Sequence, residues 1–323
     1  MWNTDREIFM APYNSITPRL CLLSTQRLLF GLATRLSKYL WIVVCGVLLF
    51  TPSKSPQAEG KLIFKSNFGA GTEVGIRNNK DTLTGTDSTT GYSWNSLVSS
   101  TSIFRDVFFQ YIANAPFEDW VTTDIRSIPG PNGNPVNALF MEVKGDDPYH
   151  TSLTRNELEF QPKWNLNPNQ FYAKFWMRIE DDYIQKWPDK HAWNNIWELK
   201  EPRDSNSGGG TNNWRMTVYI KRDGDTPYWQ FHKEQVQPTR ITEHLENNSK
   251  VPVPIGKWFQ VESFYKYHPN KGQFYFAVDG QVVFNHTGRV GHANNPRGVE
   301  LVSIFKNYRD REWFTNGNST HHY

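Results

Sequence analysis

The stretch Phe274-Tyr275-Phe276-Ala277-Val278-Asp279-Gly280-Gln281-Val282-Val283-Phe284 decides the fold class of this 323-residue chain. Two runs of β-branched and aromatic residues flank the pair Asp279-Gly280, which favours the positive backbone angles that a two-residue hairpin turn needs. The stretch therefore predicts two antiparallel strands joined by a tight turn.

Similar short runs recur along the chain, separated by clusters of Gly, Pro, Asn and Asp. We expect strands within residues 61–68, 138–143, 155–160, 171–179, 195–200, 214–221, 228–233, 258–267, 273–279, 281–285 and 299–308. No internal repeat and no long amphipathic helix is visible in the sequence. The pattern therefore predicts an all-β fold, a two-sheet antiparallel sandwich of the jelly-roll type.

The first 60 residues differ in character from the rest. Residues 39–50 form an apolar run that follows Arg35 and Lys38. The run is too short to span a bilayer comfortably, and the preceding charges are typical of a secretory signal peptide. We predict a leader over residues 1–60, one domain over 61–323 and a secreted, extracellular or periplasmic protein without stable membrane association after processing. A membrane anchor is the alternative.

Cysteine usage and charge limit the function further. Cys21 and Cys45 both lie in the leader, so the remaining chain has no disulfide and no thiolate metal site. Six of the 35 basic residues and three of the 32 acidic residues lie in the first 60, so the remainder carries 29 of each. Without a basic excess we expect no nucleic-acid partner, and we expect a monomer.

Two of the expected strands place ionisable side chains on one surface. Alternation puts Arg155, Glu157 and Glu159 on the same face of their strand. A second strand offers Glu198 and Lys200 in the same way. We therefore expect a charged surface built from at least two strands.

A third strand carries an unusual polar face. In residues 171–179 the apolar side chains alternate with Tyr172, Lys174, Trp176 and Arg178. Aromatic faces stack on sugar rings and cations pair with carboxylates, so this row suits a polyanionic sugar chain. An ordinary solvated surface is the alternative, and the sequence leaves both open.

Several motifs together resemble a known family. They are the opening run 62–68, Arg155-Asn156-Glu157-Leu158, the strand 256–261, the hairpin turn Val278-Asp279-Gly280 and the late run 304–308. In this order they are similar to the concanavalin A-like jelly-roll polysaccharide lyases, a group that includes alginate, glucuronan and heparin-type lyases. The resemblance implies a carbohydrate-active enzyme that cleaves an anionic, uronate-containing polysaccharide by β-elimination.

The chain also departs from that family. Where alginate lyases carry Gln-x-His, this sequence has Glu198-Leu199-Lys200, and a Gln230-Phe231-His232 occurs one strand later. The family's closing motif is reduced to Phe305-Lys306-Asn307-Tyr308. The catalytic base has therefore been replaced, relocated or lost.

The resemblance implies three tasks for the site. A cation neutralises the uronate carboxylate, a base removes the C5 proton, and an acid protonates the departing oxygen. We expect Arg155 and Lys200, with Arg178 as a further candidate, to pair with the carboxylate, Tyr308 and a histidine to move protons, and Glu157 and Glu198 to position them. Candidate catalytic residues are Arg155, Glu157, Glu198, Lys200, His232 and Tyr308; candidate substrate contacts are Tyr172, Lys174, Trp176, Arg178, Gln230, Lys306 and His150.

Two other functions stay open. Glu157 and Glu198 are also suited to act as the paired carboxylates of an endo-acting glycoside hydrolase, similar to the β-glucanases built on this fold. A non-catalytic carbohydrate-binding module is the third option, because the fold hosts lectins as well. We expect no cofactor, although a structural calcium ion is compatible with the fold.

Overall fold

The computed structural model describes residues 62–112, 120–144, 153–163, 169–183, 193–201, 214–236, 239–291, 299–310 and 320–322. All of them belong to one compact unit. The predicted leader with its apolar run 39–50, the candidate substrate contact His150 and the domain boundary at residue 60 lie outside the described residues, so all three stay predictions. Within the described ranges, no helix has the length and apolar character needed to cross a membrane.

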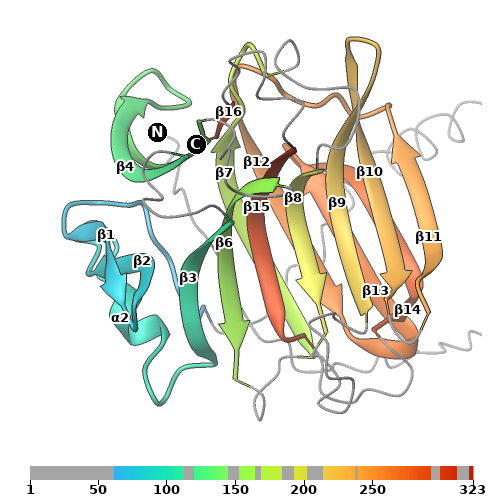
Figure 1. The fold of residues 1–323 in the computed structure, drawn as a ribbon, viewed down its shortest axis with the longest axis horizontal. Coiled ribbons are helices and arrows are strands. Elements are labelled where there is room, and N and C mark those ends of the chain that lie inside the picture. The colour runs from blue at the N-terminus through green and yellow to red at the C-terminus, as the bar shows by residue number, and fades with distance from the viewer. Residues whose placement is uncertain are drawn as a thin grey trace, which may run out of the picture. The chain divides into compact units, whose positions relative to one another are not determined.

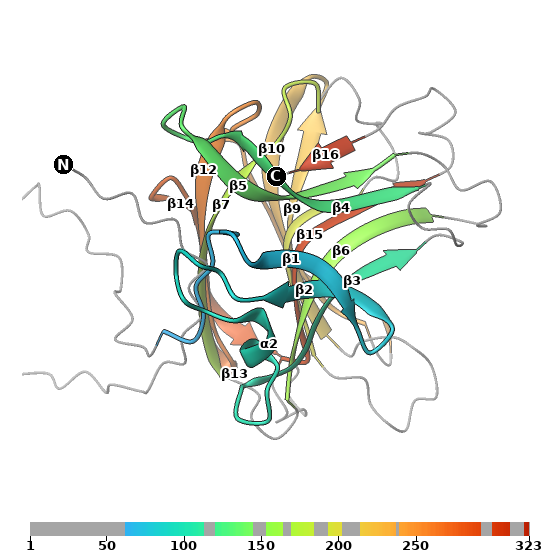
Figure 2. The same cartoon turned by 90° about the vertical axis from the view of Figure 1, so that its left-hand side faces the viewer.

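Two antiparallel sheets pack face to face (Figures 1 and 2). The larger has seven strands in the order β11 (Ile241–Asn248), β10 (Thr226–Gln235), β9 (Trp214–Asp223), β8 (Trp193–Lys200), β15 (Leu301–Asp310), β6 (Leu153–Pro162) and β3 (Phe104–Ile112). The smaller has four, in the order β14 (Gln281–Val290), β13 (His268–Val278), β12 (Trp258–Lys266) and β7 (Gln170–Arg178). The predicted all-β, two-sheet antiparallel sandwich of the concanavalin A-like jelly-roll type is confirmed.

Shorter elements complete the unit. The hairpin of β1 (Thr72–Arg77) and β2 (Lys80–Gly85) precedes a single helical turn, α2 (Trp94–Leu97). A three-stranded sheet contains β16 (Thr320–His322), β5 (Pro135–Val143) and β4 (Val121–Pro129). The Asn156 side chain on β6 donates hydrogen bonds to Thr122 O and to Thr123 Oγ1 of β4, so this sheet lies on the core side of β6.

Aromatic side chains fill the space between the two main sheets. The rings of Phe171 and Phe175 on β7 each lie 6.2 Å from that of Trp197 on β8. Further along, the Phe231 ring of β10 stacks on Phe274 of β13 at 4.9 Å. Offset and tilted ring contacts of this kind stabilise a core beyond the area that they bury, so these pairs fix the two sheets against each other.

The hairpin predicted between β13 and β14 is confirmed. Asp279 and Gly280 have φ angles of +49° and +74°, and Val278 pairs with Gln281 across the turn. Asp279 tolerates the left-handed region because a short polar side chain is penalised less there than a branched one. The turn therefore forms for the reason that the sequence indicated.

Candidate functional site

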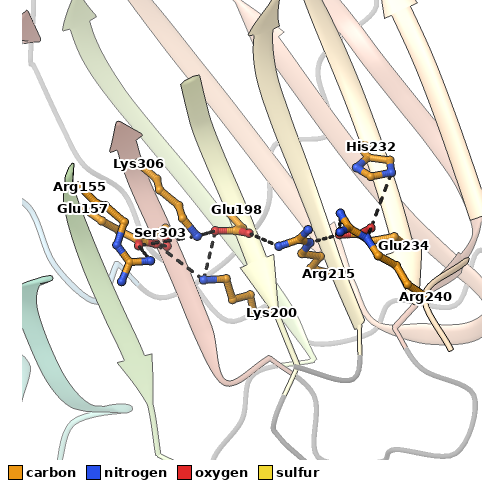
Figure 3. A network of polar contacts seen from close by, with 10 residues as sticks. All are labelled: Arg155, Glu157, Glu198, Lys200, Arg215, His232, Glu234, Arg240, Ser303 and Lys306. Atoms are coloured by element: carbon orange, nitrogen blue, oxygen red, sulfur yellow. Dashed lines mark hydrogen bonds and ion pairs between the residues drawn. The ribbon is translucent and has the colours of Figure 1, made fainter. Parts of the chain in front are cut away.

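A buried network of charged side chains covers the face of the seven-stranded sheet that points away from the four-stranded sheet (Figure 3). On β6, Leu158 and Phe160 enter the core, so Arg155 and Glu157 take the opposite face. On β8, Trp197 and Leu199 enter the core, which leaves Glu198 and Lys200 on the network face. The predicted charged surface is therefore a feature of the fold.

An extra residue in β15 completes this face. Ile304 pairs with Leu158 and Lys306 pairs with Glu157, so Phe305 has no partner on β6 and forms a β-bulge. Its φ angle of +55° is unusual for a bulky side chain. Because the bulge shifts the alternation by one residue, Ser303 and Lys306 both point to the network face, while Phe305 packs on Phe175 in the core.

Glu157 lies at one centre of the network and is fully buried, with a side-chain exposure of 0%. Ser303 Oγ donates a hydrogen bond to its Oε1, and Arg155 Nη1 lies 3.2 Å from its Oε2. The Nζ atoms of Lys306 and Lys200 lie 3.7 Å and 3.8 Å from its carboxylate oxygens. One carboxylate therefore holds three cations in place.

Glu198 forms the second centre and is also fully buried. Its Oε2 accepts a hydrogen bond from Lys306 Nζ at 2.7 Å and lies 3.2 Å from Lys200 Nζ. Arg215 Nη1 on β9 lies 3.9 Å from its Oε1. Since Lys200 and Lys306 contact both carboxylates, the two centres form one unit across β6, β15 and β8.

Arg215 extends the network to β10. Its Nε donates a hydrogen bond to Glu234 Oε1, and Arg240 Nε donates to Glu234 Oε2 at 2.8 Å. His232 Nε2 lies 4.0 Å from the same carboxylate. The network therefore runs across β6, β15, β8, β9 and β10. Figure 3 shows its side chains and the contacts between them.

Both central glutamates are ionised. Burial alone would raise the pKa of Glu157, but Lys306, Lys200 and Arg155 together hold that pKa below its ordinary value of 4.5. Burial also acts to raise the pKa of Glu198, but Lys200, Lys306 and Arg215 together hold that pKa below 4.5 as well. Neither carboxyl therefore has a proton to donate near neutral pH.

Glu159 behaves in the opposite way. Burial and the nearby negative charge of Glu157 raise the pKa of Glu159 from 4.5 to about 7. Its Oε2 accepts a hydrogen bond from Gln161 Nε2 at 3.2 Å. The alternation in the sequence had already placed Glu159 on this face, but it was not among the predicted site residues.

The sequence reasoning missed five further members of this face. These are Arg215, Tyr219, Glu234, Arg240 and Ser303. Alternation with the core residues Trp214, Met216 and Val218 was the signal that could have found Arg215 and Tyr219. Burial and the charge of Glu198 raise the pKa of Tyr219, so its phenol stays protonated.

His232 and Tyr308 stand at separate positions along the face. The strand register places His232 of β10 opposite Thr217 of β9, which lies opposite Glu198 of β8, which in turn lies opposite Ser303 of β15. Tyr308 lies three strands away at about 4.8 Å each and about 13 Å further along β15, so the two backbones are about 19 Å apart. Its backbone pairs with that of Arg155, and its side chain lies outside the described part.

His232 is suited to accept a proton. Burial lowers its pKa below 6.5, and the positive charges of Arg215 and Arg240 add to this effect against the pull of Glu234. Its Nε2 lies 3.3 Å from Thr242 Oγ1. Because the pKa of His232 lies below 6.5, its imidazole is neutral near pH 7. On the same strand and face, Gln230 Nε2 donates to Asn247 Oδ1 at 2.9 Å.

The predicted row on β7 lies elsewhere. Phe171, Ala173, Phe175 and Met177 enter the core, so Tyr172, Lys174, Trp176 and Arg178 point outward from the four-stranded sheet. Tyr172 Oη donates a hydrogen bond to Glu262 Oε2 at 3.0 Å on the neighbouring strand, and Lys174 Nζ lies 3.5 Å from Glu262 Oε1. A sugar chain lying on the charged network would therefore not touch these four residues.

The described ranges contain no group of three or more His, Cys, Asp or Glu residues that could hold a metal ion. The carboxylates of Glu157, Glu198 and Glu234 already form ion pairs with lysine or arginine. The expectation of no cofactor, with a structural calcium as an option, stays a prediction.

The chain resembles several solved structures, although no protein-family model and no curated protein matches it. The endo-β-1,4-glucuronan lyase from Trichoderma reesei is 15% identical, with 67% of this chain and 91% of that chain covered and a TM-score of 0.42. A mutant of the alginate lyase Aly36B, in complex with alginate trisaccharide, is 12% identical, with coverages of 78% and 95% and a TM-score of 0.42.

A hydrolase is also among the similar structures. The GH131 β-glucanase catalytic domain from Podospora anserina is 11% identical, with 72% of this chain and 85% of that chain covered and a TM-score of 0.35. All three proteins have concanavalin A-like folds, and the lyases among them are of the group that the sequence motifs resemble. At such identities an activity does not transfer, so the function has to be argued from the site itself.

Proposed function

We propose that this chain is a secreted polysaccharide lyase that cleaves a uronate-containing polysaccharide by β-elimination. The observation that carries the proposal is that the carboxylates of the network are buried more deeply than its cations. Its carboxylates are completely buried, with exposures of 0% for Glu157, Glu198 and Glu234, whereas Arg155, Lys200 and Arg215 keep 8%, 9% and 17% of their side chains exposed. An arriving sugar chain therefore meets cations first.

The net charge of the network supports an anionic substrate. Below the pKa of Glu159, which is about 7, the cations Arg155, Lys200, Arg215, Arg240 and Lys306 outnumber the carboxylates of Glu157, Glu198 and Glu234 by two, and above it the excess is still one. Charges in such a partly buried site are screened less by salt than charges on an open surface. A uronate carboxylate would neutralise part of this excess, whereas a neutral glucan would leave it unpaired.

Elimination assigns the cations a chemical task. A guanidinium or ammonium on the substrate carboxylate stabilises the negative charge that develops when C5 loses its proton. The base takes H5, the C5–H electrons form the C4–C5 double bond, the bond from C4 to O4 breaks, and the departing O4 takes a proton. A guanidinium such as that of Arg155 can pair with a carboxylate through two parallel donors, and Lys200 and Lys306, which contact the same Glu157 carboxylate as Arg155, add charge next to it.

Tyr308 is the proposed proton carrier for this step. Its backbone pairs with that of Arg155, and it follows Lys306 by two residues on the same strand. A neighbouring cation lowers the pKa of a phenol and so eases its use as a base. His232 and Gln230, further along the face, are proposed to bind a neighbouring sugar unit.

One observation favours a hydrolase as the second candidate. A carboxyl with a pKa of about 7, Glu159, follows the ionised Glu157 by two residues on the same strand face. Carboxyls whose surroundings separate their pKa values are the usual acid and base of glycosidases. The pair first considered, Glu157 and Glu198, lacks such a separation because both pKa values are lowered.

Product chemistry distinguishes the two. The purified full-length protein is incubated with polyglucuronate, alginate, heparin and a neutral β-glucan, and the ultraviolet absorbance of unsaturated uronate is recorded together with new reducing ends. A lyase raises both signals on at least one uronate polymer and neither on the β-glucan. Reducing ends that form without absorbance would identify a hydrolase and refute the proposal.

A further inference from the structure

A second site lies on the other side of β15 from the charged network. A cavity of about 420 Å³ occupies the seam where the four-stranded and the three-stranded sheets lie side by side without pairing. Residues 135–139 of β5 form one wall, and Phe175 and Trp176 of the edge strand β7 form the other. Ile304 and Phe305 line it from β15, while Ser303 and Lys306 face the network.

The lining indicates an uncharged ligand. Of the described residues that line the cavity, none is an Asp, Glu, Lys, Arg or His. A carboxylate in this cavity would lose hydration without meeting a cation, so its binding is disfavoured. The cavity is therefore chemically unlike the network, which carries an excess of cations.

Two tryptophans mark the outer end of the cavity. Trp176 on β7 and Trp258 on β12 both stand on the outer face of the four-stranded sheet, and both are half-buried. They are diagonal neighbours, because Trp258 pairs with Arg178 and Trp176 pairs with Gln260. Trp258 Nε1 donates to Pro129 O at 2.8 Å, which fixes its ring. Fixed indole faces stack on the apolar faces of sugar rings.

Polar side chains inside the lining argue against a purely apolar ligand. Ser66, Asn67, Thr89 and Asn137 all line the cavity. Small-molecule sites are mostly apolar with a few polar groups that bond to the ligand, so a ligand that carries hydroxyl groups suits this lining. A hydrocarbon ligand would cover these polar side chains without adding a hydrogen bond.

From these observations we propose that the seam cavity, lined by Asn67, Trp176, Trp258 and Phe305, binds one or two uncharged sugar units. Its volume falls within the range of small-molecule sites, which are mostly apolar with a few polar groups. The site is separate from the charged face and binds without turnover, so it does not depend on the reaction proposed there.

Isothermal titration calorimetry of the full-length protein with cellobiose, laminaribiose and mannobiose tests this. We expect at least one of them to bind, and we expect Trp176→Ala and Trp258→Ala each to weaken binding about tenfold. Phe264→Ala is the matched control, because this aromatic residue on the outer face of β12 does not line the cavity, and binding should stay unchanged.

A second variant covers the case in which a tryptophan substitution unfolds the protein. Asn67→Leu keeps the size of the side chain but removes a polar group from the lining of the cavity, and it should weaken sugar binding about fivefold. The uronate analogue cellobiouronate should bind at least tenfold more weakly than cellobiose at this site.

The proposal is overturned if none of the three disaccharides binds. It is also overturned if a sugar binds and its affinity is unchanged by Trp176→Ala, Trp258→Ala and Asn67→Leu, since the sugar then occupies another surface. Binding of benzyl alcohol without binding of any disaccharide would show an apolar site instead. None of these results bears on unsaturated products, so the elimination proposal is tested separately.

Discussion

Glu198→Gln is the most informative single perturbation of the charged network. The amide keeps the shape of the side chain but removes the charge that faces Lys306 at 2.7 Å, Lys200 at 3.2 Å and Arg215 at 3.9 Å. Removal of one partner from a buried ion pair costs about 3–5 kcal/mol, because the remaining charges stay desolvated. Glu157 still contacts both lysines, so we expect the lower end, about 3 kcal/mol of unfolding free energy.

Urea unfolding near pH 7, followed by tryptophan fluorescence, measures this loss. Glu262→Gln is the matched control, since Glu262 also accepts a hydrogen bond and contacts a lysine but lies on the opposite sheet with 15% of its side chain exposed. We expect the control to change stability by less than about 1 kcal/mol. A loss below about 1 kcal/mol in Glu198→Gln would show that Glu198 is not an ionised centre of the network.

The same variant makes a prediction on pH. The folded pKa of Glu198 lies below its ordinary value of 4.5, so its ionised form stabilises the fold fully above pH 4.5. That contribution is lost as pH falls through the lower folded pKa, because the unfolded chain then binds the proton first. The stability gap between the wild type and Glu198→Gln should therefore narrow below pH 4.5. A gap that stays constant would contradict the assignment.

Four further predictions concern the proposed chemistry. Arg155→Lys keeps the charge but loses the planar guanidinium, so we expect about a tenfold rise in KM for a uronate polymer. An unchanged KM would show that Arg155 makes no bidentate contact with the substrate carboxylate. Glu159→Gln removes a carboxyl whose pKa in the folded protein is raised to about 7. Because the unfolded chain ionises this carboxyl from pH 4.5 upward, it destabilises the fold increasingly between pH 4.5 and pH 7. The variant should therefore be more stable than the wild type at pH 8 but not at pH 4, as measured by urea midpoints, and equal differences at the two pH values would refute the shift. Deletion of Phe305 removes the bulged residue, so Lys306 follows Ile304 directly and regular alternation still puts Lys306 on the network face; we expect a lower urea midpoint from the lost contact with Phe175 but retained turnover, and a folded yet inactive deletion variant would show that the bulge itself is needed. Tyr308→Phe should abolish formation of unsaturated products while polymer binding measured by calorimetry stays within about twofold, and undiminished turnover would exclude the phenol from proton transfer.

Alternation in the sequence predicted which side chains of one strand share a face. It placed Arg155 with Glu157 and Glu198 with Lys200 correctly, because a strand has a fixed side-chain period of two. Alternation does not tell to which sheet a strand belongs. The polar row of β7 therefore turned out to lie on the far side of the sandwich from the network.

The bulge and the outer strands were not predictable in the same way. Strict alternation over β15 would put Lys306 on the core face with Ile304, and only the unpaired Phe305 reverses this. Arg215 and Glu234 meet through the register of β9 and β10, which pairs them directly. Register depends on long-range packing, so the sequence carried no local signal for this contact.

Mass spectrometry of the first products from polyglucuronate tests the central claim most directly. If the cationic face performs β-elimination, each new non-reducing end carries a double bond, so every fragment with such an end is lighter by one water molecule than an ordinary oligoglucuronate, and only the fragment with the polymer's original non-reducing end keeps the full mass. A product series in which all fragments have the full hydrated mass would contradict the account and would point to hydrolysis with Glu159 as the acid.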